Sequence, residues 1–406
     1  MKRIGIIGGG ASGMFAAIQA AKEGADVTIL ESGERLGKKI LSTGNGKCNL
    51  TNLFMDESCY YSENKPFVAD ALKRFTLEDT LQAFRSFGLM LRDRNGYVYP
   101  LCEQATVVSD ILRLMLKEYG VKVITGFKAS GVEKKGGLFR VNGEGKQSFS
   151  FERVILCTGG RAVPKTGSDG SGYTIAKSLG HGLVPVVPAL ALLICGEAYF
   201  KGVSGVRTYA KLDLIIDGKQ ASTEIGELQL TDSGISGIPV FQFSRIAAYA
   251  LRGRQEVKVR IDAMPDISAD ELYELVRVHR LLTGSCTAEE FFTGMLNKKL
   301  MLLFMKLADV KPSQELSELK EHQILRVCAL CKCWEVTVTG TNSFDAAQVC
   351  AGGVDTTMVT ENMESKLLPG LYFAGELLDV DGKCGGYNLQ WAWTSGAIAG
   401  RSAARR

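Results

Sequence analysis

The glycine motif Gly8-Gly9-Gly10-Ala11-Ser12-Gly13 is the first segment whose residue types and spacing favour chemistry. In a G-x-G-x-x-G motif the first glycine permits a tight turn, the second lets the backbone approach a pyrophosphate, and the third lets a helix pack closely. Free N–H groups at the start of that helix attract phosphate oxygens. Glu31, eighteen residues after Gly13, suits the hydroxyls of an adenosine ribose and would repel a 2′-phosphate. The motif predicts a dinucleotide site without separating FAD from NAD.

A basic, glycine-punctuated loop follows at Lys38–Asn49, with the sequence KKILSTGNGKCN. An NAD-binding unit normally continues quickly to its next strand, so a long loop here is unusual. Such a loop can lay backbone N–H groups and ammonium groups along a phosphate or a flavin. The alternative is a solvated basic turn.

A third segment lies near the C-terminus, where the strand-like run Leu371–Glu376 precedes the glycines and polar residues of Gly385–Gln390. A helix is predicted to begin at the second of these glycines, and its N-terminus would carry partial positive charge. In a flavoprotein this charge stabilises the negative charge that gathers on the pyrimidine edge of the reduced ring. The alternative is a surface loop before a packed C-terminal helix.

The hydrophobic pattern predicts the elements that must position these segments. Strands at Arg3–Ile7 and Asp26–Leu30 flank a helix at Ala11–Lys22, and this βαβ start predicts a parallel sheet covered by helices. From residue 188 to 264 the pattern changes to short strands, and from Ser268 to Gln323 it becomes helical. The C-terminal part returns to strand, glycine turn and helix. A discontinuous first domain with a substantial insertion is therefore expected.

Composition excludes several other classes of protein. The 46 glycines are about 11% of the chain against ~7% in average proteins, yet no G-X-Y period makes them collagen-like. The longest apolar run, Leu183–Cys195, is shorter than the about 20 residues of a membrane helix. The net charge of +4 is too small to demand a nucleic-acid or membrane partner. Eleven cysteines without a signal-peptide pattern favour free thiols in a reducing cytoplasm.

The clustered cysteines are predicted to pack rather than to bind metal. Cys328, Cys331 and Cys333 lack a fourth ligand at a standard zinc spacing. Cys48 and Cys384 lie in or beside the second and third segments, but they are too distant in sequence for a recognisable redox dithiol. No metal site is expected.

Tyr97 and Tyr99 flank a predicted hairpin turn at Asn95-Gly96. A tyrosine beside a flavin can protonate a carbanion. Core packing of the two rings is the favoured interpretation.

Together these segments resemble the BaiN-like, aminoacetone-oxidase-like family of FAD-dependent oxidoreductases, a bacterial branch of the two-dinucleotide-binding-domain flavoproteins. The similar stretches span the chain from end to end, with a slight departure at Asn362–Lys366. They are IGGGASGMFAA, LGKKILSTGNGKCNLTN, VILCTGGRAVPKTGSDGSGYTIAKSLGH, GELQLTDSGISG, AGGV, NMESKLLPGLYFAGELLDVDG and GGYNLQWAWTSGAIAG. The resemblance is specific for family and cofactor, and much less specific for substrate.

The resemblance implies non-covalent FAD in an extended form, with binding residues that fall into groups along the cofactor. The residues expected at the pyrophosphate and the adenosine are Gly8, Gly10, Ala11, Ser12 and Gly13, with Glu31 at the ribose and Ala129 at the adenine. Those expected to line the flavin side are Lys38, Lys39, Thr43, Gly44, Gly46, Cys48 and Asn49. Those expected near the pyrophosphate, ribitol and ring are Thr158, Gly159, Gly375, Glu376, Gly386, Tyr387 and Asn388. The sequence assigns no catalytic acid or base.

The expected fold class is α/β. A Rossmann-like FAD-binding domain of residues 1–190 and 341–406 would carry an inserted β-rich domain of residues 191–265 and 324–340. A helical domain of residues 266–323 would be nested within the insertion.

The favoured function is a cytoplasmic FAD-dependent oxidoreductase that transfers hydride through flavin N5. Within the resembling family this implies NAD(P)H-dependent reduction of a conjugated C=C bond in a 3-oxo steroid or bile-acid-like small molecule. One alternative is a flavin amine oxidase for an aminoacetone-like substrate with O₂ as acceptor. Another is a flavoprotein with an RNA- or protein-binding role, which predicts a basic patch on the insertion.

Overall fold

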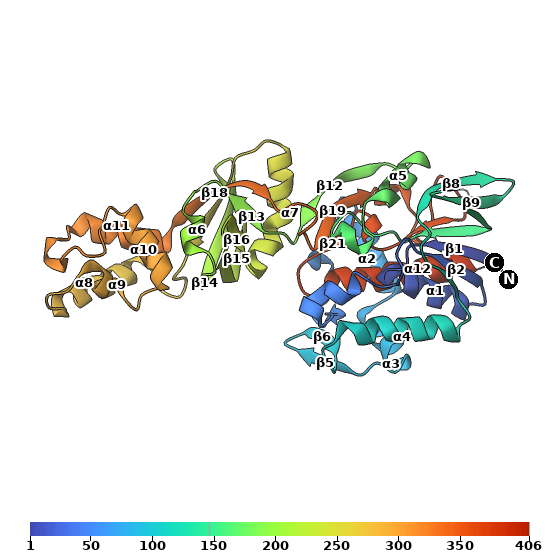
Figure 1. Cartoon of the computed structure of the whole chain (residues 1–406), viewed down its shortest axis with the longest axis horizontal. Coiled ribbons are helices and arrows are strands. Elements are labelled where there is room, and N and C mark those ends of the chain that lie inside the picture. Colours follow the sequence, from blue (N-terminus) through green and yellow to red (C-terminus); the bar gives the residue numbers. More distant parts are fainter. Residues whose placement is uncertain (146, 406) are drawn as a thin grey trace. The chain divides into compact units, whose positions relative to one another are not determined.

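The computed structural model describes residues 1–145 and 147–405 (Figure 1). The chain divides into two compact units. The Rossmann unit comprises Met1–Val187 and Phe344–Arg406, and the inserted unit comprises Pro188–Ser343. The inserted unit is thus one continuous segment of the chain, and it divides the sequence of the Rossmann unit into two parts.

The Rossmann unit is built on a five-stranded sheet in the order β20-β11-β1-β2-β7, and all four neighbouring pairs are parallel. Its strands are β1 (Arg3–Ile7), β2 (Asp26–Leu30), β7 (Lys122–Ile124), β11 (Arg153–Leu156) and β20 (Leu371–Phe373). The last four residues of β1 are buried, as expected for a strand covered on both faces of a parallel sheet. The predicted βαβ start is confirmed with the bounds that the hydrophobic pattern gave.

Helix α1 (Ala11–Lys22) packs against the long C-terminal helix α12 (Tyr387–Ala404). A Cβ on Gly396 would lie 2.6 Å from the Ser12 carbonyl oxygen, and one on Gly400 would overlap the Ala16 carbonyl. Small residues let the two helix backbones approach closely. The contact fixes the start of α12 relative to the glycine turn before α1.

Smaller elements surround this core. Antiparallel strands are β3 (Thr51–Asn52), β4 (Tyr60–Tyr61), β5 (Leu91–Arg94), β6 (Tyr97–Pro100), β8 (Ala129–Lys135), β9 (Leu138–Gly143), β10 (Ser148–Phe151) and β21 (Asp381–Gly382). They pair as β3-β6-β5, β10-β9-β8 and β21-β4, while β12 (Leu183–Ala189) pairs with β19 (Val349–Val354). The remaining helices are α2 (Lys65–Arg74), α3 (Leu77–Ser86), α4 (Ala105–Glu118) and α5 (Ser171–Ser178).

The inserted unit contains a closed barrel in the order β13-β16-β15-β14-β17-β18. Its strands are β13 (Leu193–Cys195), β14 (Arg207–Ile216), β15 (Lys219–Leu230), β16 (Gly234–Ser236), β17 (Val257–Asp262) and β18 (Trp334–Thr341). Burial alternates along β18, where Trp334, Val336 and Val338 are buried, because successive strand residues face opposite sides. The apolar side chains of the strands therefore face the interior of the barrel.

Helices accompany the barrel within the same unit. They are α6 (Phe200–Val203), α7 (Ile238–Arg252), α8 (Ala269–Leu282), α9 (Ala288–Phe292), α10 (Lys298–Leu307) and α11 (Glu321–Lys332). Residues 324–332 were expected in the β-rich part, and this element assignment is wrong because α11 continues to Lys332. Ile324, Val327, Cys328 and Cys331 are buried at helical spacing. Two of the clustered cysteines thus pack the inner face of a helix.

None of the helices described in residues 1–145 and 147–405 is long and apolar enough to cross a membrane.

Candidate functional site

The glycine turn joins β1 to α1 through backbone that only glycine accepts. Gly8 has a φ of +101°, and its N–H donates to the Leu30 carbonyl oxygen over 2.8 Å. A Cβ on Gly8 would overlap the Cys157 carbonyl, and one on Gly13 would overlap the Gly8 carbonyl. The turn therefore brings the ends of β1, β2 and β11 to the start of α1.

Gly10 is the residue of this turn that faces free space. It caps α1 with ordinary backbone angles, and no side chain bonds the first N–H groups of the helix. Within the described residues, no atom lies within 4 Å of the place where a Gly10 Cβ would stand. Open space before unbonded helix N–H groups suits a pyrophosphate. Ala11 and Ser12 continue from it as the first residues of α1.

Glu31 ends β2 as a buried carboxylate. Its Oε2 accepts from the Gly9 N–H and its Oε1 from the Gly33 N–H, both over 2.7 Å. The Phe127 N–H donates to the Glu31 carbonyl oxygen, which places the start of β8 at Ala129 near the same end of the sheet. These three regions meet where a Rossmann fold binds adenosine.

Lys38 lies beside Gly33, whose N–H group donates to Glu31. Its Nζ is 3.1 Å from the place of a Gly33 Cβ, and its side chain is otherwise exposed. The resemblance implied a position for it along the flavin side. The two adjacent lysines therefore point toward different parts of the site.

Lys39 instead joins the basic loop to the C-terminal motif. Its Nζ lies 2.6 Å from Glu376 Oε2, and the two side chains are 22% and 18% exposed. The other carboxylate oxygen, Oε1, accepts from the Cys350 N–H over 2.8 Å. Partial burial makes such a pair more costly to break than a surface salt bridge. It holds together segments that are 337 residues apart in sequence.

The loop between these anchors has an unusual backbone. Gly44, Asn45, Gly46 and Cys48 all have positive φ, from 53° to 82°. The Cys48 N–H donates to the Thr43 carbonyl oxygen over 3.0 Å, and this bond closes the turn. Non-glycine residues with positive φ cost free energy and often occur at ligand-binding loops.

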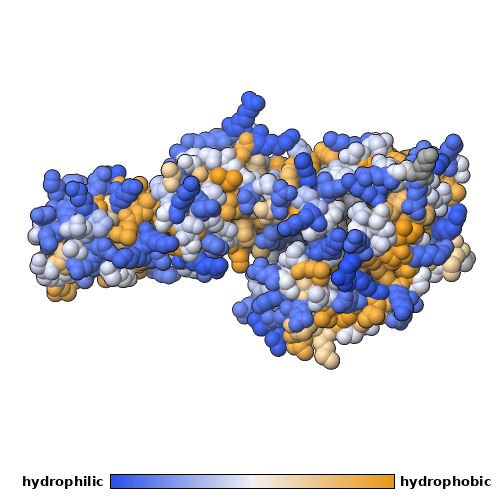
Figure 2. Space-filling view, viewed as in Figure 1, coloured by the Kyte–Doolittle hydropathy of each residue, from blue (hydrophilic) through white to orange (hydrophobic). Residues whose placement is uncertain are grey.

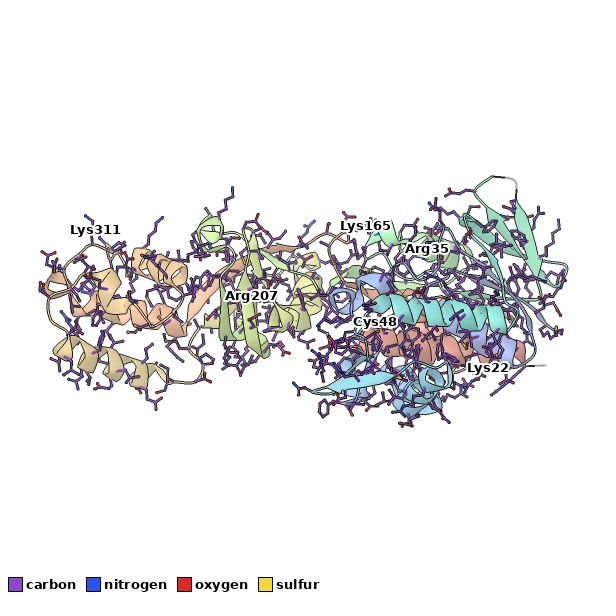
Figure 3. All side chains as sticks on the ribbon, turned by 60° about the horizontal axis from the view of Figure 1, so that its bottom comes forward. Lys22, Arg35, Cys48, Lys165, Arg207 and Lys311 are labelled. Atoms are coloured by element: carbon purple, nitrogen blue, oxygen red, sulfur yellow. The ribbon has the colours of Figure 1, made fainter. Side chains whose placement is uncertain are left out.

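Cys48 is fully buried beneath this loop (labelled in Figure 3). Burial raises the pKa of its thiol to about 12, although a hydrogen bond with Thr43 opposes the rise. The thiol is therefore neutral at physiological pH and is not a reactive thiolate.

Asn49 carries a buried polar atom without a partner. Its Oδ1 has no hydrogen bond within the described residues. A Cβ on Gly386, which has a φ of +96°, would lie 2.9 Å from this oxygen. Because buried acceptors are nearly always satisfied in proteins, Asn49 is suited to a ligand N–H group beside the start of α12.

Tyr387 and Asn388 use their side chains within the protein. The Tyr387 hydroxyl donates to the Phe54 carbonyl oxygen over 3.1 Å. Asn388 accepts from the Gly382 N–H over 2.9 Å and donates to the Gly382 carbonyl oxygen over 2.8 Å. A ligand at this helix start would therefore meet the backbone at Gly386 more readily than these side chains.

Thr158 and Gly159 follow β11, and Gly375 follows β20, so parallel strands bring them to the same sheet edge as the glycine turn. Gly375 has a φ of +76°, and its N–H donates to the Ser395 hydroxyl over 2.9 Å. A Cβ on Gly375 would overlap Ser12. The C-terminal motif thus touches the first turn of α1.

Gln390 is a positioning residue that sequence reasoning missed. Its Oε1 accepts from the Thr51 hydroxyl over 2.7 Å, and its Nε2 donates to the Thr80 hydroxyl over 2.8 Å. The side chain is fully buried. The only signal was a glutamine within the apolar run LQWAW, which resembles any buried helix.

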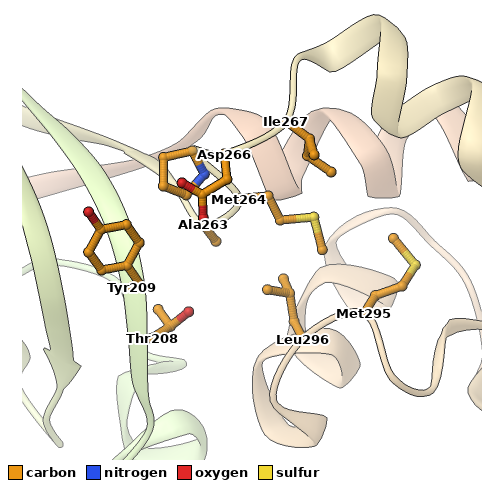
Figure 4. Close-up of a pocket in the computed structure, with 9 residues that line it drawn as sticks. Thr208, Tyr209, Ala263, Met264, Asp266, Ile267, Met295 and Leu296 are labelled. Carbon is orange, nitrogen blue, oxygen red and sulfur yellow. The ribbon is translucent and has the colours of Figure 1, made fainter.

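A separate hollow lies in the inserted unit, between β14 and the segment that leads to α8 (Figure 4). Its volume is about 350 Å³, and its lining includes Tyr209, Met264 and Met295. No residue predicted from the sequence to bind the cofactor lines it.

The chain is similar over its full length to proteins of known name, two of which follow. Residues 2–402 match the family described as HI0933-like protein Rossmann domain. The chain is 46% identical over 409 residues to the 3-dehydro-bile acid delta(4,6)-reductase of Clostridium scindens, covering 100% of both chains. It is 30% identical over 418 residues to the ribosomal RNA dihydrouridine synthase of Haemophilus influenzae, covering 99% of this chain and 98% of the relative.

Solved structures share the fold. The 3-ketosteroid-delta4-(5alpha)-dehydrogenase from Rhodococcus jostii RHA1 has a TM-score of 0.51 at 15% identity, covering 100% of this chain and 97% of that one. The 3-ketosteroid delta1-dehydrogenase from Sterolibacterium denitrificans has a TM-score of 0.52 at 12% identity, covering 100% of both. At these identities the likeness concerns the fold alone.

Proposed function

Because the chain belongs to the HI0933-like family of FAD-binding Rossmann proteins, we propose that it reduces a C=C bond conjugated to the ketone of a 3-oxo steroid of the bile-acid type. The 46% full-length identity to a 3-dehydro-bile acid delta(4,6)-reductase carries the substrate class. The second relative is named for making dihydrouridine. Reduction of a C=C bond is therefore the reaction type that the two names have in common.

Two features of the site support FAD as the cofactor. The space before Gly10 accommodates a pyrophosphate, and the unpartnered Asn49 Oδ1 offers a buried acceptor where the flavin ring is expected. We assign Glu31 and Ala129 to the adenosine end, and Gly44 and Gly386 to the flavin end. We assign the other residues implied by the resemblance to the same cofactor, with Lys38 moved to the adenosine end.

When bound, FAD supplies the hydride from its reduced ring. The chain's own contribution is to bind and orient. The N-terminus of α12 places partial positive charge beside Gly386, where it would stabilise negative charge on the cofactor. Lys39 is held by Glu376, so its ammonium group adds little net charge and mainly fixes the loop.

NAD(P)H is the proposed electron donor. The sequence contains one complete G-x-G-x-x-G motif, and this motif is assigned to FAD. The nicotinamide would therefore bind transiently against the flavin and leave before the steroid enters.

The charge of the inserted unit argues against the RNA-binding alternative. Residues 188–343 contain 18 Lys and Arg against 19 Asp and Glu, whereas an RNA-binding surface needs an excess of positive charge. Several of its basic side chains are paired with acids, such as Arg207 with Glu227 and Arg326 with Asp309. Figure 2 shows many hydrophilic residues on the visible face of the molecule.

Anaerobic half-reactions test the proposal. NADH or NADPH is expected to bleach the yellow flavin of the purified protein, and a 3-oxo-Δ4 or Δ4,6 steroid is expected to restore the colour. An amine that bleaches the flavin, followed by recovery in air with peroxide, would instead establish the oxidase. Ribosomal RNA, whose uridines would be the substrate of the RNA-binding alternative, should not restore the colour. If it does, the argument from the charge of the inserted unit is wrong. A protein that binds no FAD contradicts all three assignments.

A further inference from the structure

Two tyrosines of β6 face the same side of their strand. Tyr97 and Tyr99 are half-buried, while Val98 between them is 3% exposed, because successive strand residues point to opposite faces. Strand β6 pairs with β3, which begins at Thr51 directly after the flavin-side loop. The pairing of β6 with β3 therefore places both rings near the proposed flavin site.

Both rings lie against glycines of that site. Tyr99 Cε1 is 3.6 Å from the place of a Gly44 Cβ, an ordinary van der Waals separation. Tyr97 Cε1 is only 2.9 Å from the place of a Gly385 Cβ. The rings thus lie beside the loop before β3 and the segment before α12, the two segments assigned to the flavin side.

The hydroxyls of these two tyrosines are available, unlike those of their neighbours. Within the described residues, neither hydroxyl has a hydrogen-bond partner. By contrast, the Tyr60 hydroxyl donates to the Tyr387 carbonyl oxygen over 3.0 Å, and the Tyr387 hydroxyl donates to the Phe54 carbonyl oxygen. Half-buried hydroxyls without partners, close to the segments assigned to the flavin side, are suited to contact a ligand.

The surroundings distinguish Tyr99 from Tyr97. Burial raises the pKa of Tyr99, and the neighbouring Tyr97, Cys384 and Glu103 raise it further, while Arg94 opposes them. Tyr99 therefore keeps its proton throughout the physiological range and can act as an acid. Tyr97 is pressed against Gly385 and is better suited to position the ring of its neighbour.

We propose that the Tyr99 hydroxyl donates the proton that completes reduction of the C=C bond. This inference rests on the proposed function. The β-carbon of the enone accepts the hydride that reduced FAD supplies, and electron density moves to the α-carbon. The α-carbon takes the proton of the Tyr99 hydroxyl, which leaves a saturated ketone and a tyrosinate. Water then returns a proton to the tyrosinate, and the flavin is left oxidised.

Tyr99→Phe tests the proposal because it removes one oxygen and no hydrogen bond within the protein. Reduction of the flavin by NAD(P)H is expected to be unchanged, since no substrate proton is involved. Reoxidation by the enone is expected to slow by about 10²- to 10⁴-fold, the usual contribution of a general acid. Tyr97→Phe is expected to slow it by less than tenfold, and the surface variant Tyr119→Phe not at all.

Binding gives a readout that is independent of turnover. The 3-oxo-Δ4 steroid, titrated calorimetrically into the oxidised protein, is expected to bind Tyr99→Phe and the wild type with the same affinity, because carbon accepts no hydrogen bond from the hydroxyl. Unchanged reoxidation in Tyr99→Phe would overturn the proposal, and so would a loss of affinity that accounts for slower reoxidation. A larger slowing of reoxidation in Tyr97→Phe would also overturn it.

The wild-type protein supplies a test that needs no variant. Its reoxidation by the enone should be flat through neutral pH and fall only above pH 10, the ordinary pKa of tyrosine, because the pKa of Tyr99 is raised. A rate that already falls between about pH 8 and pH 10 would contradict Tyr99 as the acid, because the pKa of Tyr99 lies above its ordinary value. If NAD(P)H bleaches the flavin of the wild type but no enone restores its colour, the proposed function is wrong. This result differs from the one that would contradict only the role of Tyr99, in which the enone restores the colour equally fast in Tyr99→Phe.

Discussion

The two units of this protein use glycine in different ways. The Rossmann unit holds 35 of the 46 glycines, and the inserted unit of residues 188–343 holds 11. In the Rossmann unit, Gly10 and Gly46 border space that no described residue fills. In the inserted unit, Gly234 and Gly237 pack against the backbone of the barrel itself. The space at Gly10, before the start of α1, suits a ligand, whereas Gly234 and Gly237 let barrel strands approach each other. Other glycines of the inserted unit, such as Gly284, also stand at open positions.

The cores of the two units are alike in their use of large rings. In the inserted unit Trp334 is stacked on Phe200 at 6.0 Å and edge-on to Phe304 at 5.5 Å. In the Rossmann unit Trp393 lies 5.5 Å from Phe15 and 5.1 Å from Phe84. Large side chains fill space and contribute stability in both units, so the difference between them lies in the glycine segments and not in the cores.

The largest expected effect is loss of the cofactor in Gly10→Val. The new side chain would enter the space assigned to the pyrophosphate, so gel filtration should yield colourless protein. Because the site of the Cβ is empty and the φ of Gly10 is −78°, the apoprotein should remain folded by circular dichroism. Gly284→Val, at an equally open position of the inserted unit, is the matched control and should stay yellow. If Gly10→Val retains FAD, the assignment of this turn is wrong.

Gly400→Val should destabilise the Rossmann unit. Its Cβ would overlap the Ala16 carbonyl in the contact between α1 and α12, and overpacking of this kind costs about 3 kcal/mol. Urea unfolding followed by tryptophan fluorescence measures the loss. Hydrogen exchange should show faster opening of α1 while the barrel strands keep their protection. Uniformly faster exchange in both units would contradict the separation of their cores.

Lys332→Met should weaken only the inserted unit. The Lys332 ammonium lies 2.7 Å from Asp262 Oδ2 and donates to the carbonyl oxygens of Met264 and Ile267, and its side chain is 14% exposed. Its removal should cost about 2 kcal/mol in the free energy of unfolding, as for other hydrogen bonds to charged groups. The affinity for FAD should stay unchanged.

The exposed lysine Lys311 (labelled in Figure 3) provides the control for that variant. Lys311→Met should change stability by less than about 0.5 kcal/mol. Loss of FAD in Lys332→Met would show that the inserted unit supports the cofactor site.

The smallest effect is an alkaline loss of stability that both units share. Burial raises the pKa of Cys48 in one unit and of Cys195 in the other from 9.0 to about 12. The folded thiols keep protons that the unfolded chain releases, so this stability is complete below pH 9 and is lost as pH rises toward 12. At pH 10 each thiol should account for about 1.4 kcal/mol.

Urea unfolding at pH 8 and pH 10 measures this loss. Cys48→Ala and Cys195→Ala should each lose less stability between the two pH values than the wild type does. An identical loss in a variant would show that its thiol ionises normally in the folded protein.

The sequence by itself determined the features whose cause is local. The strand–glycine–helix start could be predicted because the tight turn at Gly8 and the close packing at Gly13 require glycine whatever surrounds them. The start of α12 at Gly386 follows from a similar short-range rule. The family resemblance then added the cofactor.

Only the tertiary structure decided which side chains those segments present to one another. Lys39 meets Glu376, Tyr387 and Asn388 turn to their own backbone, and Tyr97 and Tyr99 face the glycine loops although packing had been favoured for them. Each outcome depends on segments that are tens to hundreds of residues apart in sequence, so no spacing along the chain encodes it. Sequence periodicity predicts which face of an element is buried, but the partner of that face is settled only when the chain has folded.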